Sequence, residues 1–253
     1  MSSRWWSTWV APLVGLAVLF GLWELYVRVA DVRPLVLPRP SFVVDEVLDD
    51  PHFFFVQNGW PTVQEAFWGF VLALVVGGAL ATAMVHSRFV ERAGLPVIVL
   101  IQVTPVVALA PAFLAVFGFR SPWPEILTAA LFCLVPFVMN TFVGLRSVDP
   151  DTLEVLQSVA ASRWEVQWRL RFPHALPYLF AAARVCVGLA LVGAVVGEFF
   201  GGATEGLGTA IDVGFTRQFA GQAWGSIFAL AFIGVMATVL LVVAERRLLR
   251  WQS

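Results

Sequence analysis

Side chains that could carry out chemistry are few in this sequence and are spread along it. The two cysteines, Cys133 and Cys186, lie in apolar runs and lack the spacing of a metal site or a disulfide framework. The three histidines, His52, His86 and His174, form no cluster in the sequence. An enzyme needs a nucleophile and a base, or a set of metal ligands, at one place. These residues therefore predict neither catalysis nor a metal or cofactor on this chain.

Polar side chains inside long apolar runs are the other candidates for function, because burying them in lipid costs free energy. Glu198 either lines the outer mouth of a pathway or accepts N–H bonds from the loop that follows it. The uncharged polar residues either face a solvated pathway or hydrogen-bond between helices. The candidates for a translocation pathway are Gln102, Thr104, Asn140, Thr141 and Glu198.

Three further charged residues lie within or at the ends of apolar runs. Arg184 is fourteen residues from Glu198, which is about 21 Å along an ideal helix, so the two cannot pair within one helix. We expect Arg184 to be structural, with its guanidinium reaching water. Glu24 and Arg28 are four residues apart and predict an ion pair on one helical face.

The composition is that of a membrane protein. Of 253 residues, 59% are hydrophobic and 13% are charged, and the mean hydropathy is +0.83. Soluble globular proteins contain about 45–50% apolar and about 25% charged residues. This excess excludes a soluble enzyme and a disordered chain. The formal net charge of −1 gives no basic field for nucleic acid.

Six apolar runs are each long enough to cross a bilayer, which takes about 20 residues. They predict an all-α polytopic membrane protein with about six transmembrane helices, in which residues 1–253 form a single domain. The first run continues into charged residues without a small-residue cleavage site, so we expect it to be retained. The runs are Trp5–Trp23, Ala66–Val85, Ala93–Phe119, Ile126–Leu145, Ala175–Phe200 and Gln218–Ala244.

The orientation follows from the arginines, since the sequence contains no lysine. With a cytoplasmic N-terminus, ten arginines fall in cytoplasmic segments and four in external ones. The positive-inside rule therefore predicts that both termini are cytoplasmic. Segments 31–60, 118–124 and 201–217 are then external loops, the first with a short helix over 41–49 capped by Ser41.

The cytoplasmic segment 146–174 contains two signals for the start of a helix. Asp149 can cap a helix whose first residue is Pro150. Ser162 and Glu165 have the spacing of a capping box. We expect two short helices with an exposed turn between them. They are too small to form a core, so they must lie on the membrane helices, on a partner, or on both.

An aromatic stripe follows the second of these starts. Trp164, Trp168 and Phe172 recur every four residues, and Pro173 is expected to end the helix. On spacing alone, an ordinary amphipathic loop at the membrane interface accounts for this pattern as well as a docking surface does.

The same loop resembles the EAA loop of bacterial ABC-importer permeases. That pattern is Glu-Ala-Ala, three residues, Gly, nine residues, then Ile-x-Leu-Pro. Here the spacing is kept in full, Glu154 and Pro173 match by identity, Val155 and Leu156 replace the two alanines, and Ala160 stands where Gly is usual. The residues that the resemblance assigns to ATPase coupling are Glu154, Ala160, Ala161, Ser162, Arg163, Trp164 and Pro173.

The resemblance implies a type I ABC-importer permease fold in the bacterial inner membrane. In such importers the loop docks on a cytoplasmic ATPase. A P-loop needs a lysine, so ATP and Mg²⁺ would bind on a separate ATPase chain. Six helices are half of the usual membrane core, which implies a second copy of this chain and two ATPase copies. An extracytoplasmic substrate-binding protein would dock on 31–60 and 201–217.

Further motifs resemble permeases for sulfonates, taurine, nitrate, thiamine pyrimidine and riboflavin precursors. These are 37–41, 144–149, 161–164 and 193–198. Segments 105–111 and 177–180 are most similar to the pyrimidine and riboflavin branch, which we favour. An intramembrane enzyme is a second alternative, which the scattered cysteines and histidines disfavour, and an ion-coupled secondary transporter is the first. That class shows paired repeats and buried acidic residues, and one glutamate near an interface gives it poor support.

Small residues line the fifth predicted helix, and small residues permit close helix packing in lipid. The helix packs either against a two-fold mate or within one subunit. These residues are Gly188, Ala190, Gly193, Ala194, Gly197 and Gly201.

Overall fold

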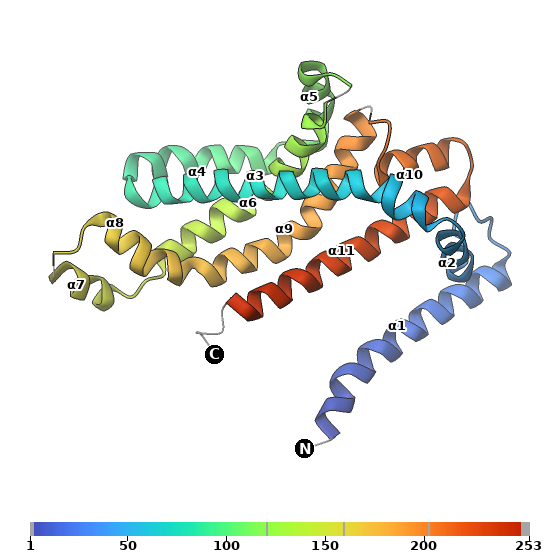
Figure 1. The fold of residues 1–253 in the computed structure, drawn as a ribbon, viewed down its shortest axis with the longest axis horizontal. Helices are drawn as coiled ribbons and strands as arrows, with labels where there is room; N and C mark the ends of the chain where they lie inside the picture. Colours follow the sequence, from blue (N-terminus) through green and yellow to red (C-terminus); the bar gives the residue numbers. More distant parts are fainter. Residues whose placement is uncertain (1–2, 120, 159, 202, 249–253) are drawn as a thin grey trace.

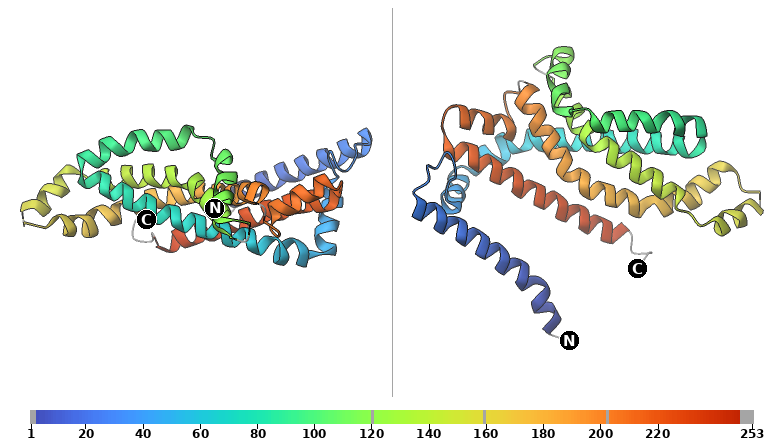
Figure 2. Two further views of the ribbon diagram at one scale, coloured as in Figure 1. Left: turned by 90° about the horizontal axis from the view of Figure 1, so that it is seen from above. Right: turned by 180° about the vertical axis from the view of Figure 1, so that it is seen from behind.

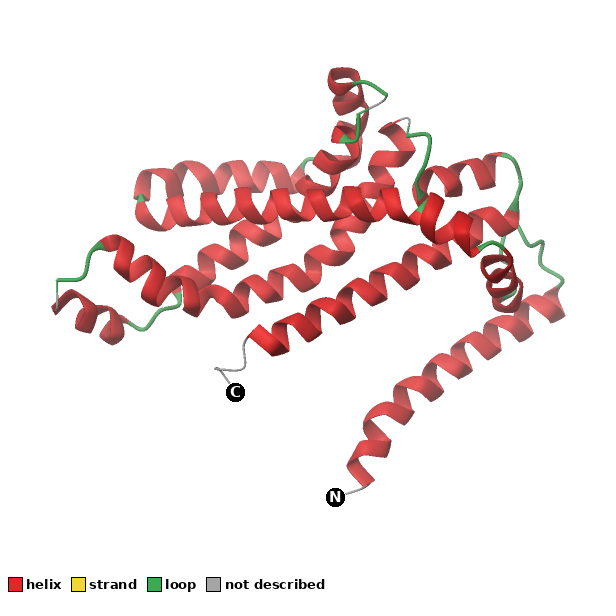
Figure 3. Ribbon diagram, in the orientation of Figure 1, coloured by secondary structure: helices red, strands yellow, loops and turns green. Residues whose placement is uncertain are grey.

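A computed structural model describes residues 3–119, 121–158, 160–201 and 203–248. This part of the chain is helical and contains no strand (Figure 3). The elements are α1 (Ser3–Ala30), α2 (Pro40–Asp49), the π-helix η1 (His52–Gln57), α3 (Gly59–His86), α4 (Arg88–Val103), the 3-10 helix η2 (Val106–Leu109), α5 (Ala110–Phe117), α6 (Trp123–Arg146), α7 (Pro150–Ser158), α8 (Arg163–Val166), the π-helix η3 (Gln167–Arg171), α9 (Phe172–Gly201), α10 (Leu207–Thr216) and α11 (Ala220–Leu248).

Among the described residues, five helical stretches are long and apolar enough to cross a membrane, or six if one bent pair counts as a span. The prediction of an all-α polytopic membrane protein is confirmed. The third apolar run is not one straight helix, because α4 and the η2–α5 segment meet at 88°. The break falls at Thr104, which is extended, and Pro105, whose ring disfavours helix at the preceding residue.

Helix α6 lies at the centre of the bundle, packed between α3 and α9 (Figure 1). Glycines of both neighbouring helices lie close to Ala129 of α6. A Cβ added to Gly69 of α3 would lie 2.5 Å from the Ala129 Cβ, and one added to Gly193 of α9 would lie 2.5 Å from the Ala129 Cα. The small residues of α9 therefore pack within the subunit here. Gly188 has open space beside it instead.

Helix α1 stands apart from the bundle over most of its length (Figures 1 and 2), and its last two turns, from Trp23, approach α2 and α11. The predicted ion pair is confirmed, with Arg28 Nη2 lying 2.7 Å from Glu24 Oε1. Glu24 also accepts hydrogen bonds from the Ser41 N–H at 3.1 Å and hydroxyl at 2.8 Å. Ser41 therefore ties α2 to α1 and is not the cap of α2, whose N-cap is Arg39.

Two other expectations about local structure were wrong. Segment 201–217 contains the helix α10, which begins after Gly206 at φ 124°, so Gly206 starts a helix where the sequence favoured a loop. Pro173 does not end the second loop helix, because α8, η3 and α9 follow one another without a break. The π turn at Gln167–Arg171 shifts the hydrogen bonds by one residue, and the Phe172 N–H donates to the Gln167 carbonyl. The helix thus accommodates a proline that has no N–H to donate.

Candidate functional site

The two short helices of segment 146–174 lie together at one end of the bundle, far from α2 and α10 (Figure 1). Both predicted starts are confirmed. Asp149 Oδ1 accepts the Asp151 N–H at 3.2 Å. Ser162 Oγ accepts the Glu165 N–H at 3.2 Å, and Glu165 Oε2 accepts the Ser162 N–H at 2.9 Å. The loop is therefore held by local bonds that its own residues supply.

The turn between α7 and α8 depends on Ala160. This residue has φ 54°, in the left-handed region that favours glycine. The N–H of Ala161 donates to the Leu156 carbonyl at 3.1 Å, which is the six-to-one bond of a Schellman motif. Glycine is the residue that terminates a helix in this way at least cost, which gives a physical reason for the glycine of the EAA pattern at this position.

The outer surface of the loop is both polar and aromatic. Glu154 is exposed, and the exposed fractions of Trp164 and Trp168 are 68% and 58%. Towards the bundle, Val166 and Gln167 are buried and anchor the second helix. Two large aromatic side chains that face outward at a helical spacing form a surface suited to a partner.

Sequence reasoning missed the ion pair that holds the base of this loop. Arg146, the last residue of α6, donates from Nη1 to Glu91 Oε1 at 2.6 Å and from Nη2 to Glu91 Oε2 at 2.9 Å. Its guanidinium also lies 4.7 Å from the centre of the Phe142 ring. The pair joins α4 to α6 across 55 positions, so no local pattern could have revealed it.

The predicted pathway residues do not converge on one place. Gln102 and Thr104 line a cavity of about 350 Å³ between the α4–η2 bend and α6. Asn140 Nδ2 donates to the Pro136 carbonyl of its own helix at 2.9 Å. Thr141 is buried, and its hydroxyl has no hydrogen-bond partner among the described residues.

Glu198 is buried at the opposite end of the bundle, with an exposed fraction of 2%. Its carboxyl group accepts hydrogen bonds from the Thr62 hydroxyl and the Gly208 N–H. Asn58 Oδ1 accepts the Gly206 N–H at 3.2 Å. This is the geometry of the second alternative, in which Glu198 anchors the following loop.

Two further buried carboxyl groups lie near Glu198 and were missed. Glu65 of α3 lies close to Glu198 and is 9% exposed, and Glu125 of α6 is 2% exposed. Glu65 and Glu125 both line a cavity of about 390 Å³ at this end of the bundle. In the sequence, each of these two glutamates directly precedes an apolar run. Their positions therefore indicate the end of a predicted membrane span and not a buried residue.

Arg184 is not isolated. Its Nε donates to Glu245 Oε2 of α11 at 2.8 Å, so the expected structural role of Arg184 includes a partner that the sequence did not indicate. Glu198 is not that partner, as the helical distance predicted.

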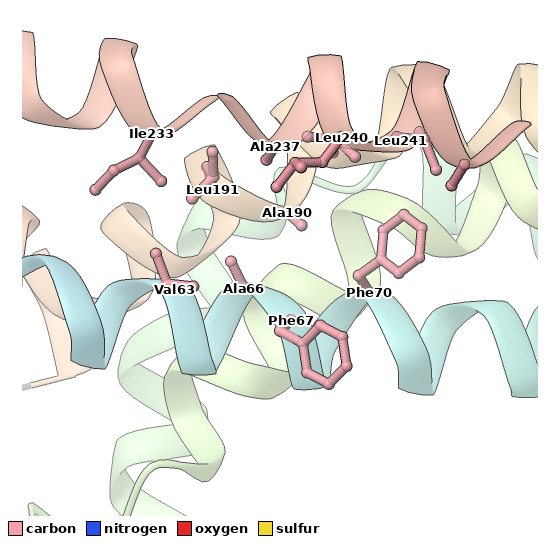
Figure 4. A pocket seen from close by; sticks show the side chains of 12 residues that line it. Val63, Ala66, Phe67, Phe70, Ala190, Leu191, Ile233, Ala237, Leu240 and Leu241 are labelled. Carbon is pink, nitrogen blue, oxygen red and sulfur yellow. The ribbon is translucent and has the colours of Figure 1, made fainter. Parts of the chain in front are cut away.

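An apolar groove of about 410 Å³ runs along the bundle between α3, α9 and α11. Phe67 and Phe70 of α3 lie on one side and Leu240 and Leu241 of α11 on the other, with Ala190 of α9 between them (Figure 4). No polar side chain lines this groove among the described residues, so it suits lipid tails or an apolar helix.

The multi-pass helical fold and the capped loop at one end define a membrane permease, and comparison with known proteins identifies its family. The family described as binding-protein-dependent transport system inner membrane component matches residues 69–251. The chain belongs to this family. It is an inner-membrane permease component of an ABC importer and not an enzyme; ATP hydrolysis belongs to separate ATPase subunits, and the family works with an ATPase and a substrate-binding protein.

Individual relatives differ in what they are named for. The chain is 32% identical over 247 residues to the formylaminopyrimidine transport permease protein ThiX of Halalkalibacterium halodurans, and the alignment covers 96% of each chain. It is 32% identical over 249 residues to the riboflavin transport system permease protein RibX of Chloroflexus aurantiacus, covering 96% of this chain and 91% of the relative. It is 29% identical over 250 residues to the taurine transport system permease protein TauC of Escherichia coli, covering 94% and 88%.

Proposed function

We propose that this permease imports a pyrimidine or riboflavin-type vitamin precursor, and that an ATPase which binds segment 146–174 drives the import. The coupling part of the proposal is carried by one observation. The α7–α8 segment is an exposed, locally capped unit whose second helix runs without a break into the membrane helix α9. A force applied at Trp164 would therefore reach α9 directly, and a force applied at Glu154 would reach it through the turn at Ala160.

The coupling surface consists of the residues that the EAA resemblance indicates. Glu154, Ala160, Ser162, Arg163 and Trp164 are all exposed. Ala161 and Pro173 are partly buried and position the turn and the start of α9. ATP and Mg²⁺ bind on the partner ATPase in this proposal. This placement puts the loop and both termini in the cytoplasm.

A cysteine crosslinking experiment tests this placement. Glu154→Cys is expected to crosslink to the ATPase of the assembled importer. Val36→Cys is the matched control, since Val36 is 68% exposed but lies in segment 31–60, which the proposal places outside the cell. Crosslinking from Val36 and not from Glu154 would contradict both the coupling role and the orientation.

A second copy of the chain completes the proposed assembly, with two ATPase subunits and one extracytoplasmic binding protein. Support comes from the exposed apolar surface of the single chain. In one strongly apolar 18-residue window of each of the spans Leu13–Ala30 and Ala220–Leu248, only 6% of the residues are buried. Lipid and a second subunit are the two surroundings that can cover such faces. The mass of the purified assembly should correspond to two permease chains, and one chain per assembly would contradict the proposal.

The proposed pathway residues are Gln102, Thr104, Asn140 and Thr141, whereas Glu198, the fifth candidate, accepts hydrogen bonds as the anchor of the following loop. Of these, Gln102 and Thr104 have the best support, because they line a cavity beside the break in the third span. A helix break exposes backbone groups that can bind a solute.

The substrate class rests on the similarity to ThiX and RibX. The test is ligand binding to the cognate binding protein, followed by ATPase stimulation in the reconstituted importer. A formylaminopyrimidine or riboflavin should bind and stimulate, and taurine, an aliphatic sulfonate and nitrate should not. Stimulation by taurine alone would refute the substrate class and leave the importer assignment intact.

A further inference from the structure

A basic cavity of about 400 Å³ lies behind the α7–α8 loop. Its walls come from both the membrane helices and the loop. Arg88 begins α4 and Arg146 ends α6, whereas Arg163 begins α8 and Arg171 ends η3. Glu91 is the only acidic residue among the described residues that line it. The four arginines and one glutamate give the lining a net charge of +3.

Three of these arginines have no counter-ion in the part of the chain that the structure describes. Arg146 is paired with Glu91, but within the described ranges Arg88, Arg163 and Arg171 form no ion pair. The Nε of Arg171 is buried and has no hydrogen-bond partner in that part of the chain. The charges of Arg171 and Arg146 are close enough to repel each other. A buried donor without an acceptor costs free energy, and converging like charges add to that cost.

We propose that this cavity binds a phosphate-bearing anion. Guanidinium groups match phosphate oxygens in charge and in the direction of their N–H donors. A phosphate would supply the missing acceptor to Arg171 and neutralise the excess charge. It would also bridge the membrane side of the cavity, at Arg88, to the loop side, at Arg163. A bound anion would therefore hold the α7–α8 loop against the membrane helices.

Two sources can supply this chemistry. One is the headgroup of an anionic phospholipid, which the cytoplasmic leaflet would offer if the proposed orientation holds. The other is free phosphate or a soluble phosphate ester. The anion site itself does not depend on the proposed substrate or on the ATPase, because it is formed by this chain alone.

The experiment uses the purified full chain in a non-ionic detergent at constant ionic strength, because salt screens such contacts. Sodium phosphate is titrated against sodium chloride, and short-chain phosphatidylglycerol against short-chain phosphatidylcholine. Binding is read as a rise in melting temperature and as lipid retained in native mass spectrometry. A response to phosphatidylglycerol alone assigns a lipid, and a response to phosphate alone assigns a free anion. A response to both assigns a site that recognises the phosphate group itself.

Variants separate this site from general charge attraction. Arg171→Gln should weaken binding about tenfold, the loss expected for one charge-assisted hydrogen bond. Arg169→Gln is the matched control, since Arg169 lies in the same turn but does not line the cavity. Arg88 lies on the opposite wall of the cavity, and Arg88→Gln should weaken binding by a similar factor. If Arg171→Gln does not fold, the affinity of Arg88→Gln is the test of the proposal. Wild-type affinity in both variants, an equal loss in Arg169→Gln, or no response to either probe would overturn the proposal.

Discussion

Replacement of Ala160 by glycine is the sharpest test of the loop geometry. Ala160 has φ 54°, and a side chain in the left-handed region costs about 1–2 kcal/mol. Glycine removes that cost but gives the unfolded chain additional freedom, worth about 0.4–1 kcal/mol. The difference predicts that Ala160→Gly stabilises the closed turn by about 1 kcal/mol, which corresponds to about fivefold in the opening equilibrium.

The neighbouring residue provides a control with the opposite sign. Ala161 is not among the residues with positive φ, so glycine there gains nothing in the folded state. Ala161→Gly should therefore destabilise the turn by about 0.4–1 kcal/mol. The same chemical change, one position apart, is expected to act in opposite directions.

Amide hydrogen exchange of the full chain in lipid nanodiscs measures both effects. The reporter is the backbone N–H at position 161, which in Ala161 donates to the Leu156 carbonyl, followed in a peptide that covers α7 and α8. Exchange should slow about fivefold in Ala160→Gly and become faster in Ala161→Gly. Faster exchange in Ala160→Gly, or the same change in both variants, would refute the left-handed turn at Ala160.

Three further predictions concern packing and polar contacts in the bundle. Gly193→Ala should lower stability by about 1–3 kcal/mol, because the added Cβ meets backbone of α6, whereas Gly188→Ala should not lower it; thermal unfolding of the two variants gives the comparison. A double-mutant cycle between Glu91 and Arg146 should give a coupling free energy of about 1 kcal/mol or less, since the Arg146 side chain is 50% exposed and water screens the pair. A much larger coupling would contradict this exposure. Glu198→Ala should expose segment 203–206 to proteolysis, because the Gly208 N–H loses its acceptor and the Thr62 hydroxyl loses one of its two acceptors, and an unchanged cleavage rate would contradict the anchor.

Most of the secondary structure could be read from the sequence because its causes are local. The apolar runs, the Asp149–Pro150 start and the Ser162–Glu165 capping box all depend on residues within a few positions of one another. The errors were local as well. Gly206 started α10 where it was expected to lie in a loop, and Pro173 continued a helix that it was expected to end, because a π turn compensates for its missing N–H.

The placement of the functional residues depended on contacts between distant positions. The sequence alone determined that the chain is a membrane protein and that two short helices begin within segment 146–174. It also determined which residues carry the resemblance to a permease family. Only the tertiary structure joined Thr62 to Glu198 across 136 positions, and only it brought Arg88 and Arg171 to one cavity. The physical reason is that hydropathy and capping act along the chain, whereas burial and ion pairing act through space, after α3, α6 and α9 have packed together.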